Sequence, residues 1–397
     1  MSLVLNTNIN SMVAQNSLTT SGGQLTSALQ QLSTGLRVNT AADDAAGYAI
    51  AQGMTSQVNG LNQAARNAND GVSLTQTASG AMTEITNDLQ TMRDLAVESL
   101  NATNSSNDRA DLNAQYAQLA ADINNVASNT QFNGVNLLDG TFQGADFQIG
   151  ANAGQIISVA SIASTSTSAI GNYYTTAAAT GAYADTTADA GNTASFDITV
   201  GTASYTTGAV TLTGNQTTDL QNIASAINQS LGSSQGIVAT VTGTGISLST
   251  AKGAAQNVTV ALNTSSTTTS SVNGLGLDAT YALGSAGGTA QNLSNTSVNS
   301  VDSSNLVLIS IDNALQQLAT SSAQLGAYQN RFQAAITGLN TTSTNLSDAK
   351  SGIVDTDYAQ ATSSLSKAQI LQQAGTAMVA QANTIPQNIL TLIQKLP

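Results

Sequence analysis

The chain has 397 residues, of which 41% are hydrophobic, 4% aromatic and 8% charged, and it contains no Cys, His or Trp. Without His and Cys it lacks the usual zinc ligands, nucleophiles and proton carriers, so we expect no catalytic centre, no metal site and no cofactor. The net charge of −13 comes with no Lys/Arg cluster, which excludes a nucleic-acid partner.

Neither the start of the chain nor its interior predicts a membrane segment. Residues 1–6 lack a cationic region followed by a long apolar run, so we expect no cleaved signal peptide. No stretch of about 18 apolar residues is present that could be inserted in a bilayer.

Leucines near the N-terminus follow a heptad pattern. Leu18, Leu25 and Leu32 repeat every seven residues, and Leu29 and Leu36 follow at an offset of four. This spacing places all five on one seam of a predicted helix. Apolar residues continue at helical spacing through 50–96 and again through 112–126, which predicts further helices.

After residue 126 the pattern changes to short apolar pieces separated by turn dipeptides. Asn133-Gly134 and Asp139-Gly140, with Phe147-Gln148-Ile149-Gly150 after them, predict one or two β-hairpins in this region. The Ser/Thr/Ala/Gly-rich stretch 161–191 is interpreted as a linker or loosely packed segment. Beyond it the sequence predicts a small ββαββ-like module, with strands at 195–200, 209–212, 237–241, 245–248 and 258–260 and a helix at 220–227.

The C-terminal part carries the clearest heptad row of the chain. Its members are Ile311, Leu318, Leu325, Phe332, Leu339, Leu346 and Ile353. A helix over 311–353 would be roughly 65 Å long, so we expect a rod that forms the core of a helical bundle. A last helix has two interleaved rows, namely Leu371, Met378, Ile385 and Leu392, and Ala368, Gly375, Ala382, Ile389 and Leu396.

The seams at the two ends predict assembly. An exposed stripe of leucines costs about 25 cal/mol per Å² left in water, so it needs a partner. The two ends can supply part of it to each other and further copies of the chain the rest, which predicts a homo-oligomer. For the central rows an intramolecular bundle is favoured, and for the terminal rows assembly is favoured. The predicted assembly seams are Leu18, Leu25, Leu29, Leu32, Leu36, Leu371, Met378, Ile385, Ile389 and Leu392.

Ordered motifs at both ends resemble bacterial flagellin, over about residues 1–150 and 300–397. Those in the N-terminal part are Leu5-Asn6-Thr7-Asn8, Leu32-Ser33-Thr34-Gly35-Leu36-Arg37, Asp43-Asp44-Ala45-Ala46-Gly47, Arg66-Asn67-Ala68-Asn69-Asp70-Gly71 and Thr130-Gln131-Phe132-Asn133-Gly134. Those in the C-terminal part are Leu325-Gly326-Ala327-Tyr328-Gln329-Asn330-Arg331-Phe332, Ser366-Lys367-Ala368-Gln369-Ile370-Leu371 and Pro386-Gln387-Asn388-Ile389-Leu390.

The resemblance implies a mainly α fold with a β-rich insert and three domains. Residues 1–40 and 357–397 would form a coiled-coil inner core, 41–160 with 300–356 a helical-bundle core with β-hairpins, and 161–299 a variable, surface-exposed domain. The implied function is the structural subunit of the extracellular flagellar filament, used for swimming motility.

The same resemblance implies a set of partners. They are the flagellar export machinery and its chaperone, the filament cap, the hook-associated proteins and, for vertebrate hosts, Toll-like receptor 5. The motif at 89–97 is similar to the helix that this receptor recognises, and Gln90, Arg93, Leu95 and Gln115 are its candidate surface. Thr91 and Gln115 stand where strongly stimulating flagellins carry Arg and Glu, which predicts weaker recognition.

Three other hypotheses were weighed against the sequence, and two of them remain. A hook-filament junction protein shares the terminal pattern. A surface adhesin would need aromatic platforms, for which Tyr173, Tyr174, Tyr183 and Tyr205 are the candidates. An inserted zinc protease is excluded because the chain has no His. Asp43-Asp44 is interpreted as a solvated or hydrogen-bonded turn rather than an acid/base pair.

Overall fold

The computed structural model describes residues 8–176, 191–231, 236–243, 245–250, 256–262, 279–283 and 289–394, without the side chains of 256, 257, 262, 279–283 and 385–394. The helices are α1 (Ile9–Thr34), α2 (Ala45–Ser99), α3 (Ser106–Asn129), α4 (Gln216–Leu231), α5 (Val301–Val354) and α6 (Tyr358–Gln394), with a 3-10 turn at Leu293–Asn295. The mainly α fold with a β-rich middle, predicted from the sequence, is confirmed.

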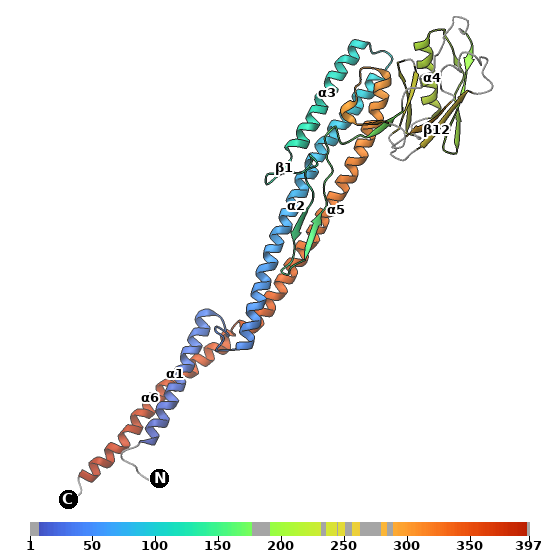
Figure 1. Cartoon of the computed structure of the whole chain (residues 1–397). Helices are drawn as coiled ribbons and strands as arrows, with labels where there is room; N and C mark the ends of the chain where they lie inside the picture. The colour runs from blue at the N-terminus through green and yellow to red at the C-terminus, as the bar shows by residue number, and fades with distance from the viewer. Residues whose placement is uncertain are drawn as a thin grey trace. The chain divides into compact units, whose positions relative to one another are not determined.

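The strands lie between α3 and α5 along the chain (Figure 1). They are β1 (Gln131–Phe132), β2 (Val135–Asn136), β3 (Ala145–Gln148), β4 (Ile156–Val159), β5 (Tyr173–Thr175), β6 (Thr193–Ala194), β7 (Phe196–Val200), β8 (Ala203–Thr206), β9 (Val210–Thr211), β10 (Ile237–Thr242), β11 (Gly245–Thr250), β12 (Gln256–Leu262), β13 (Ala279–Leu283) and β14 (Thr289–Gln291).

The chain folds into two compact units. The terminal unit comprises Met1–Ala68, Gln148–Ile156 and Ala334–Pro397, and the central unit comprises Asn69–Phe147 and Ile157–Gln333. Each of α2 and α5 therefore contributes residues to both units.

Within the central unit, α2 and α5 lie side by side and antiparallel. Three side-chain contacts follow each other along the pair: Met82 with Ser322, Arg93 with Asp312, and Ser99 with Ser304. Helix α3 lies beside them (Figure 1), and Ser105 caps its start in a capping box with Asp108. The core contains the buried α2 residues Leu74, Ala78, Met82, Ile85, Leu89, Met92 and Ala96 at helical spacing.

The Asn133-Gly134 turn predicted from the sequence joins β1 and β2. Phe132 pairs with Val135 in antiparallel register. Asn133 has φ 50° and Gly134 φ 80°, the left-handed conformation that a two-residue hairpin loop requires.

The middle of the chain forms two antiparallel four-stranded sheets, in the orders β10-β11-β5-β14 and β13-β12-β7-β8. Alternate residues of β7 are buried, starting with Phe196, and they join one apolar cluster with Leu220, Ile223 and Ile227 of α4. The predicted strands and helix are present. Strand β8, which the sequence pattern did not reveal, pairs with β7 after the turn at Gly201.

The segment predicted to be a linker is well packed where the structure describes it. Ile162, Thr165, Thr167 and Ile170 are buried. The backbone N–H of Thr165 donates to the carbonyl of Leu138 at 2.8 Å. The prediction was wrong for 161–176 because buried hydroxyls satisfied by hydrogen bonds give no hydrophobic periodicity. Residues 177–190 lie outside the described residues.

Candidate assembly surface on the terminal helices

Helix α1 has a defined start and end. Asn8 is its N-cap, and the Asn8 side-chain oxygen accepts from the backbone N–H of Ser11 at 3.1 Å. The Asn8 amide also donates to the carbonyl of Ala382 on α6 at 2.9 Å. At the other end Gly35 adopts φ 72° and donates to the carbonyl of Gln31, a left-handed C-cap that favours glycine.

The segments that follow α1 and precede α6 are joined by backbone hydrogen bonds. Leu36 and Asp355 form an antiparallel bridge, and the N–H of Thr356 donates to the carbonyl of Gly35 at 2.9 Å. The Arg37 guanidinium donates to the carbonyl of Ile353. These bonds hold the C-terminal end of α1 next to the start of α6.

Small side chains fill the contact between α1 and α6. The buried residues of α1 are Ser11, Ser21 and Ala28. Those of α6 within its described side chains are Ala361, Ala368 and Ala382. A Cβ on Gly375 would lie 3.1 Å from Leu18 Cδ1. The two helices therefore approach closely over a row of small residues, as close backbone packing requires.

The large apolar residues of the same helices remain on the surface of the single chain. Leu29 is 50% exposed, Leu371 40% and Met378 62%. The other predicted seam residues on α1, Leu18, Leu25 and Leu32, are partly buried. Leu36 is partly buried too, but it was wrongly predicted to lie on the helix, because the Gly35 cap ends α1 and Leu36 instead forms the bridge with Asp355. The predicted seam residues Ile385, Ile389 and Leu392 belong to α6, but their side chains lie outside the described residues.

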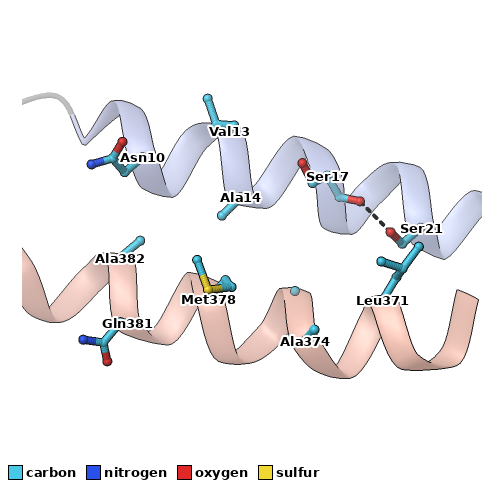
Figure 2. A pocket seen from close by; sticks show the side chains of 11 residues that line it. Asn10, Val13, Ala14, Ser17, Ser21, Leu371, Ala374, Met378, Gln381 and Ala382 are labelled. Atoms are coloured by element: carbon cyan, nitrogen blue, oxygen red, sulfur yellow. Dashed lines mark hydrogen bonds between the residues drawn. The ribbon is translucent and has the colours of Figure 1, made fainter. Parts of the chain in front are cut away.

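The two interleaved rows of α6 thus take different environments. The row with Ala368 and Ala382 faces α1, whereas the row with Leu371 and Met378 does not become buried. A groove of 570 Å³ lies along this side of the pair. Figure 2 shows Met378 and Leu371 rising from α6 opposite Ala14, Ser17 and Ser21 of α1.

Charge is nearly absent from these helices. The sequence of α1 contains no charged residue, and that of α6 contains only Lys367. Among the residues that line the groove none is ionisable. The surface can therefore bind apolar groups by excluding water, and it offers no group for acid/base chemistry.

The heptad row predicted on α5 lies in the packed interior of each unit. In the central unit Ile311, Leu318, Leu325 and Phe332 are buried, and the Phe147 ring meets the Phe332 ring edge to face at 5.3 Å. The remaining members lie in the terminal unit. There Leu339 is buried against Leu61 and Ala64, while Leu346 and Ile353 pack, partly buried, at two apolar clusters.

The candidate receptor surface lies on α2 and α3. Gln90 and Gln115 are exposed, whereas Leu95 is buried. The Arg93 guanidinium is bonded to the Asp312 carboxylate at 2.8 Å, and this ion pair raises the pKa of Arg93. In the free subunit Arg93 is thus already paired with α5.

Asp43 and Asp44 form the hydrogen-bonded turn predicted for them. The Asp43 carboxylate accepts from the backbone N–H groups of Thr40 and Asn39 at 2.8 and 3.0 Å, and these bonds lower the pKa of Asp43. Asp44 accepts from the N–H of Gly47 at 2.9 Å, at the start of α2. Both carboxylates therefore accept backbone hydrogen bonds that stabilise the turn before α2.

The described residues also bear on two other kinds of site. No group of three or more Asp and Glu side chains is placed there to hold a metal ion. None of the helices, within those same residues, has a stretch long and apolar enough to cross a membrane. Of the tyrosines proposed as adhesin platforms, Tyr173 is buried, Tyr174 and Tyr205 are partly buried, and Tyr183 lies outside the described residues.

Paired terminal helices with an uncovered apolar row, joined to a helical core and a β-rich insert, define a class of self-associating structural subunit. Comparison with known proteins agrees. The profile of the bacterial flagellin N-terminal helical region matches residues 5–143, and that of the C-terminal helical region matches residues 308–393.

Whole-length relatives identify the family. The chain is 35% identical to Flagellin A of Vibrio cholerae serotype O1 over 396 residues, covering 99% of this chain and 100% of the relative. It is 34% identical to the B-type flagellin of Pseudomonas aeruginosa, with the same coverage. A solved structure titled FliC from Burkholderia pseudomallei is similar over 66% of this chain and 99% of its own, at 29% identity and a TM-score of 0.39.

The chain belongs to the bacterial flagellin family. It is a structural subunit of a flagellar filament, in which many copies assemble. Membership of this family also characterises it as a structural, non-enzymatic protein.

Proposed function

We propose that the exposed row on α1 and α6 is the surface through which neighbouring subunits pack in the filament. The observation that carries the proposal is the division of α6 into a small row buried on α1 and a large row, Leu371 and Met378, left in water. A helix pair that leaves its larger apolar groups outside gains their burial only when another copy covers them.

In this proposal the predicted domains keep their boundaries. Residues 1–40 and 357–397 form the inner wall of the filament, 41–160 with 300–356 the layer around it, and 161–299 the outer surface. The sheets of the middle segment and the absence of charge on α1 support this assignment, because an uncharged apolar surface suits an interior.

The subunit is proposed to leave the cell unfolded, through the flagellar export machinery with its chaperone and without a cleaved signal peptide. It would then fold at the filament tip under the cap protein, beyond the hook-associated proteins. Two features support this route. The chain has no Cys that could cross-link in transit. Terminal helices that bury mainly small residues gain little stability alone, which favours their unfolding before assembly.

The role of the ends can be tested by electron microscopy of concentrated protein. The intact chain should form tubes, and a variant without residues 1–40 and 357–397 should form none, because it lacks the surface that copies share. The thermal unfolding of the trimmed variant should still show a cooperative transition from the central unit. Tubes from the trimmed variant would refute the assignment.

A second proposed role is recognition by Toll-like receptor 5 through α2 and α3. Gln90 and Gln115 are exposed and Thr91 is exposed beside them, so the receptor can reach these positions in the free subunit. Leu95 is buried, so it would support this surface through its packing against neighbouring helices. Arg93 would have to bind the receptor while its guanidinium also bonds to Asp312.

Replacing Thr91 by Arg and Gln115 by Glu should raise receptor signalling in a reporter cell line, since both add charged hydrogen-bonding groups on an accessible face. The matched control is Gln118→Glu, an exposed position on α3 outside the motif. An unchanged response in the double variant, or an equal rise in the control, would argue against this surface.

A further inference from the structure

The sulfur atoms of this chain are divided between buried and exposed positions. The chain has six Met and no Cys, so every sulfur is a thioether. In the central unit Met82 and Met92 are fully buried, at 0% exposure. On the terminal helices Met12 is 56% and Met378 62% exposed. Met54 on α2 is partly buried, and Met1 lies outside the described residues. Because oxidation of Met follows access to its sulfur, Met12 and Met378 are the most accessible thioethers in the part of the chain that the structure describes.

Met378 also occupies a position where polarity matters. It lines the apolar groove between α1 and α6, opposite the small side chains of Ala14 and Ser17 (Figure 2). The hydroxyl of Ser21 already donates to the carbonyl of Ser17 at 2.9 Å, and the Gln381 side chain points away from α1 (Figure 2). The Asn10 amide and the Ser17 hydroxyl are the other donors that line the groove, and the rest of its lining, from Val13 and Ala14 to Leu371 and Ala374, is apolar.

We propose that Met378 is a peroxide-oxidation site whose sulfoxide blocks the docking of a second copy, and that assembly in turn protects its sulfur. In the step, the sulfur lone pair attacks one peroxide oxygen, the S–O bond forms and the O–O bond breaks. The thioether loses two electrons, and hydrogen peroxide is reduced to water. The inference rests on the proposed packing of copies on the exposed row.

The sulfoxide opposes assembly because it converts a flexible apolar side chain into a polar one. Burying the S–O group in a mainly apolar groove should raise the protein concentration needed for polymerisation by about tenfold. In the filament a neighbouring subunit covers Met378, so peroxide reaches it more slowly. Unassembled subunits are thus the vulnerable form.

The experiment treats monomers and preformed filaments of the full chain with hydrogen peroxide and follows each Met by peptide mass spectrometry. In monomers Met378 and Met12 should be oxidised before Met82 and Met92. Met82 is an internal control whose sulfur also accepts from the Ser322 hydroxyl at 3.6 Å. In filaments the oxidation of Met378 should slow relative to its rate in monomers.

Two variants assign the effect on assembly to one sulfur. Met12→Leu leaves Met378 as the exposed thioether among the described residues, and after peroxide treatment this variant should need about tenfold more protein to polymerise. Met12→Leu combined with Met378→Leu keeps apolar volume, and after the same treatment it should still polymerise. If the double variant fails to polymerise even untreated, the inference is tested by the rate of Met378 oxidation in monomers compared with that in filaments of the unchanged chain.

The outcomes separate this inference from the proposed function. Equal polymerisation of treated and untreated Met12→Leu protein, or equal oxidation of Met378 in monomers and filaments, would overturn the inference while leaving the assembly surface intact. Failure of the untreated intact chain to polymerise, or tubes from the trimmed chain, would instead overturn the proposed function.

Discussion

At the residue scale, the packing of the central unit depends on one close approach. A Cβ on Gly71 would lie 2.5 Å from Phe332 Cζ, so the Phe332 ring occupies the space that any other side chain would need. The Phe332 ring also packs edge to face against the Phe147 ring. Glycine fits there, in the interior of α2, because it has no Cβ, and its low helix propensity is the cost of this contact.

Gly71→Ala should therefore destabilise the central unit by about 1–3 kcal/mol, because the ring must move within a close-packed core. The matched control is Gly80→Ala on the same helix, where no atom lies within 4 Å of the added Cβ. This control should gain roughly 0.5–1 kcal/mol from higher helix propensity. Urea unfolding of both variants followed by circular dichroism makes the comparison, and equal stabilities would contradict the role given to Phe332.

At the element scale, α1 and α6 pair through side chains too small to stabilise much on their own. Ala368 is buried against α1 in this row, and its replacement by a large residue would force the helices apart. In the proposed packing of copies, the exposed row would then be displaced from the position in which a second copy covers it. Under that proposal the small row sets the helix spacing on which assembly depends.

Ala368→Leu should weaken helix pairing by about 1–3 kcal/mol through overpacking and abolish polymerisation at concentrations where the natural chain forms tubes. Ala368→Ser, which adds only a hydroxyl, should still polymerise. Light scattering measures both, with thermal unfolding of the central unit as the check that folding is intact. Tubes from the leucine variant would mean that the pair tolerates a wider spacing.

The sequence predicted the helices better than it predicted which row faces which neighbour. The heptads on α5 contain large apolar residues without interruption, and those in the central unit are buried. On α6 the heptad period alone does not show which of the two rows is buried against α1. The choice between Ala368 and Leu371 depends on how closely α1 approaches, which is a property of the pair and not of one helix. The buried Thr165 and Thr167 escaped prediction because their burial depends on distant hydrogen-bond partners.

At the scale of the whole molecule, the β-rich insert leaves and rejoins the helical core at adjacent points. Strand β5 precedes most of the insert and β14 follows it, and the two pair antiparallel with Thr175 opposite Thr289. Strands β5 and β14 therefore form a two-stranded ribbon where the insert joins the core, and β11 pairs with the edge of β5 opposite β14.

Replacing residues 176–288 by Asn-Gly should leave the core folded, since a two-residue turn can join paired strands. The shortened chain should polymerise, and the loss of β11 beside β5 should cost stability only locally. Electron microscopy and calorimetry test this. As a control, the same dipeptide replacing residues 101–104, between α2 and α3, should disturb the core, because Asn101 and Asn104 bond to neighbouring groups there. A shortened chain that does not fold would show that the insert supports the core.

The scarcity of charge on α1 and α6 has a consequence for the medium in which the filament works. Contacts made by apolar and small side chains contain no ion pairs for salt to screen, so added salt does not weaken them by screening. Salt acts instead on the mutual repulsion of subunits that each carry a net charge of −13, and it lowers that repulsion. A swimming cell that moves from fresh to saline water thus meets conditions that favour, rather than loosen, the attachment of one subunit to the next.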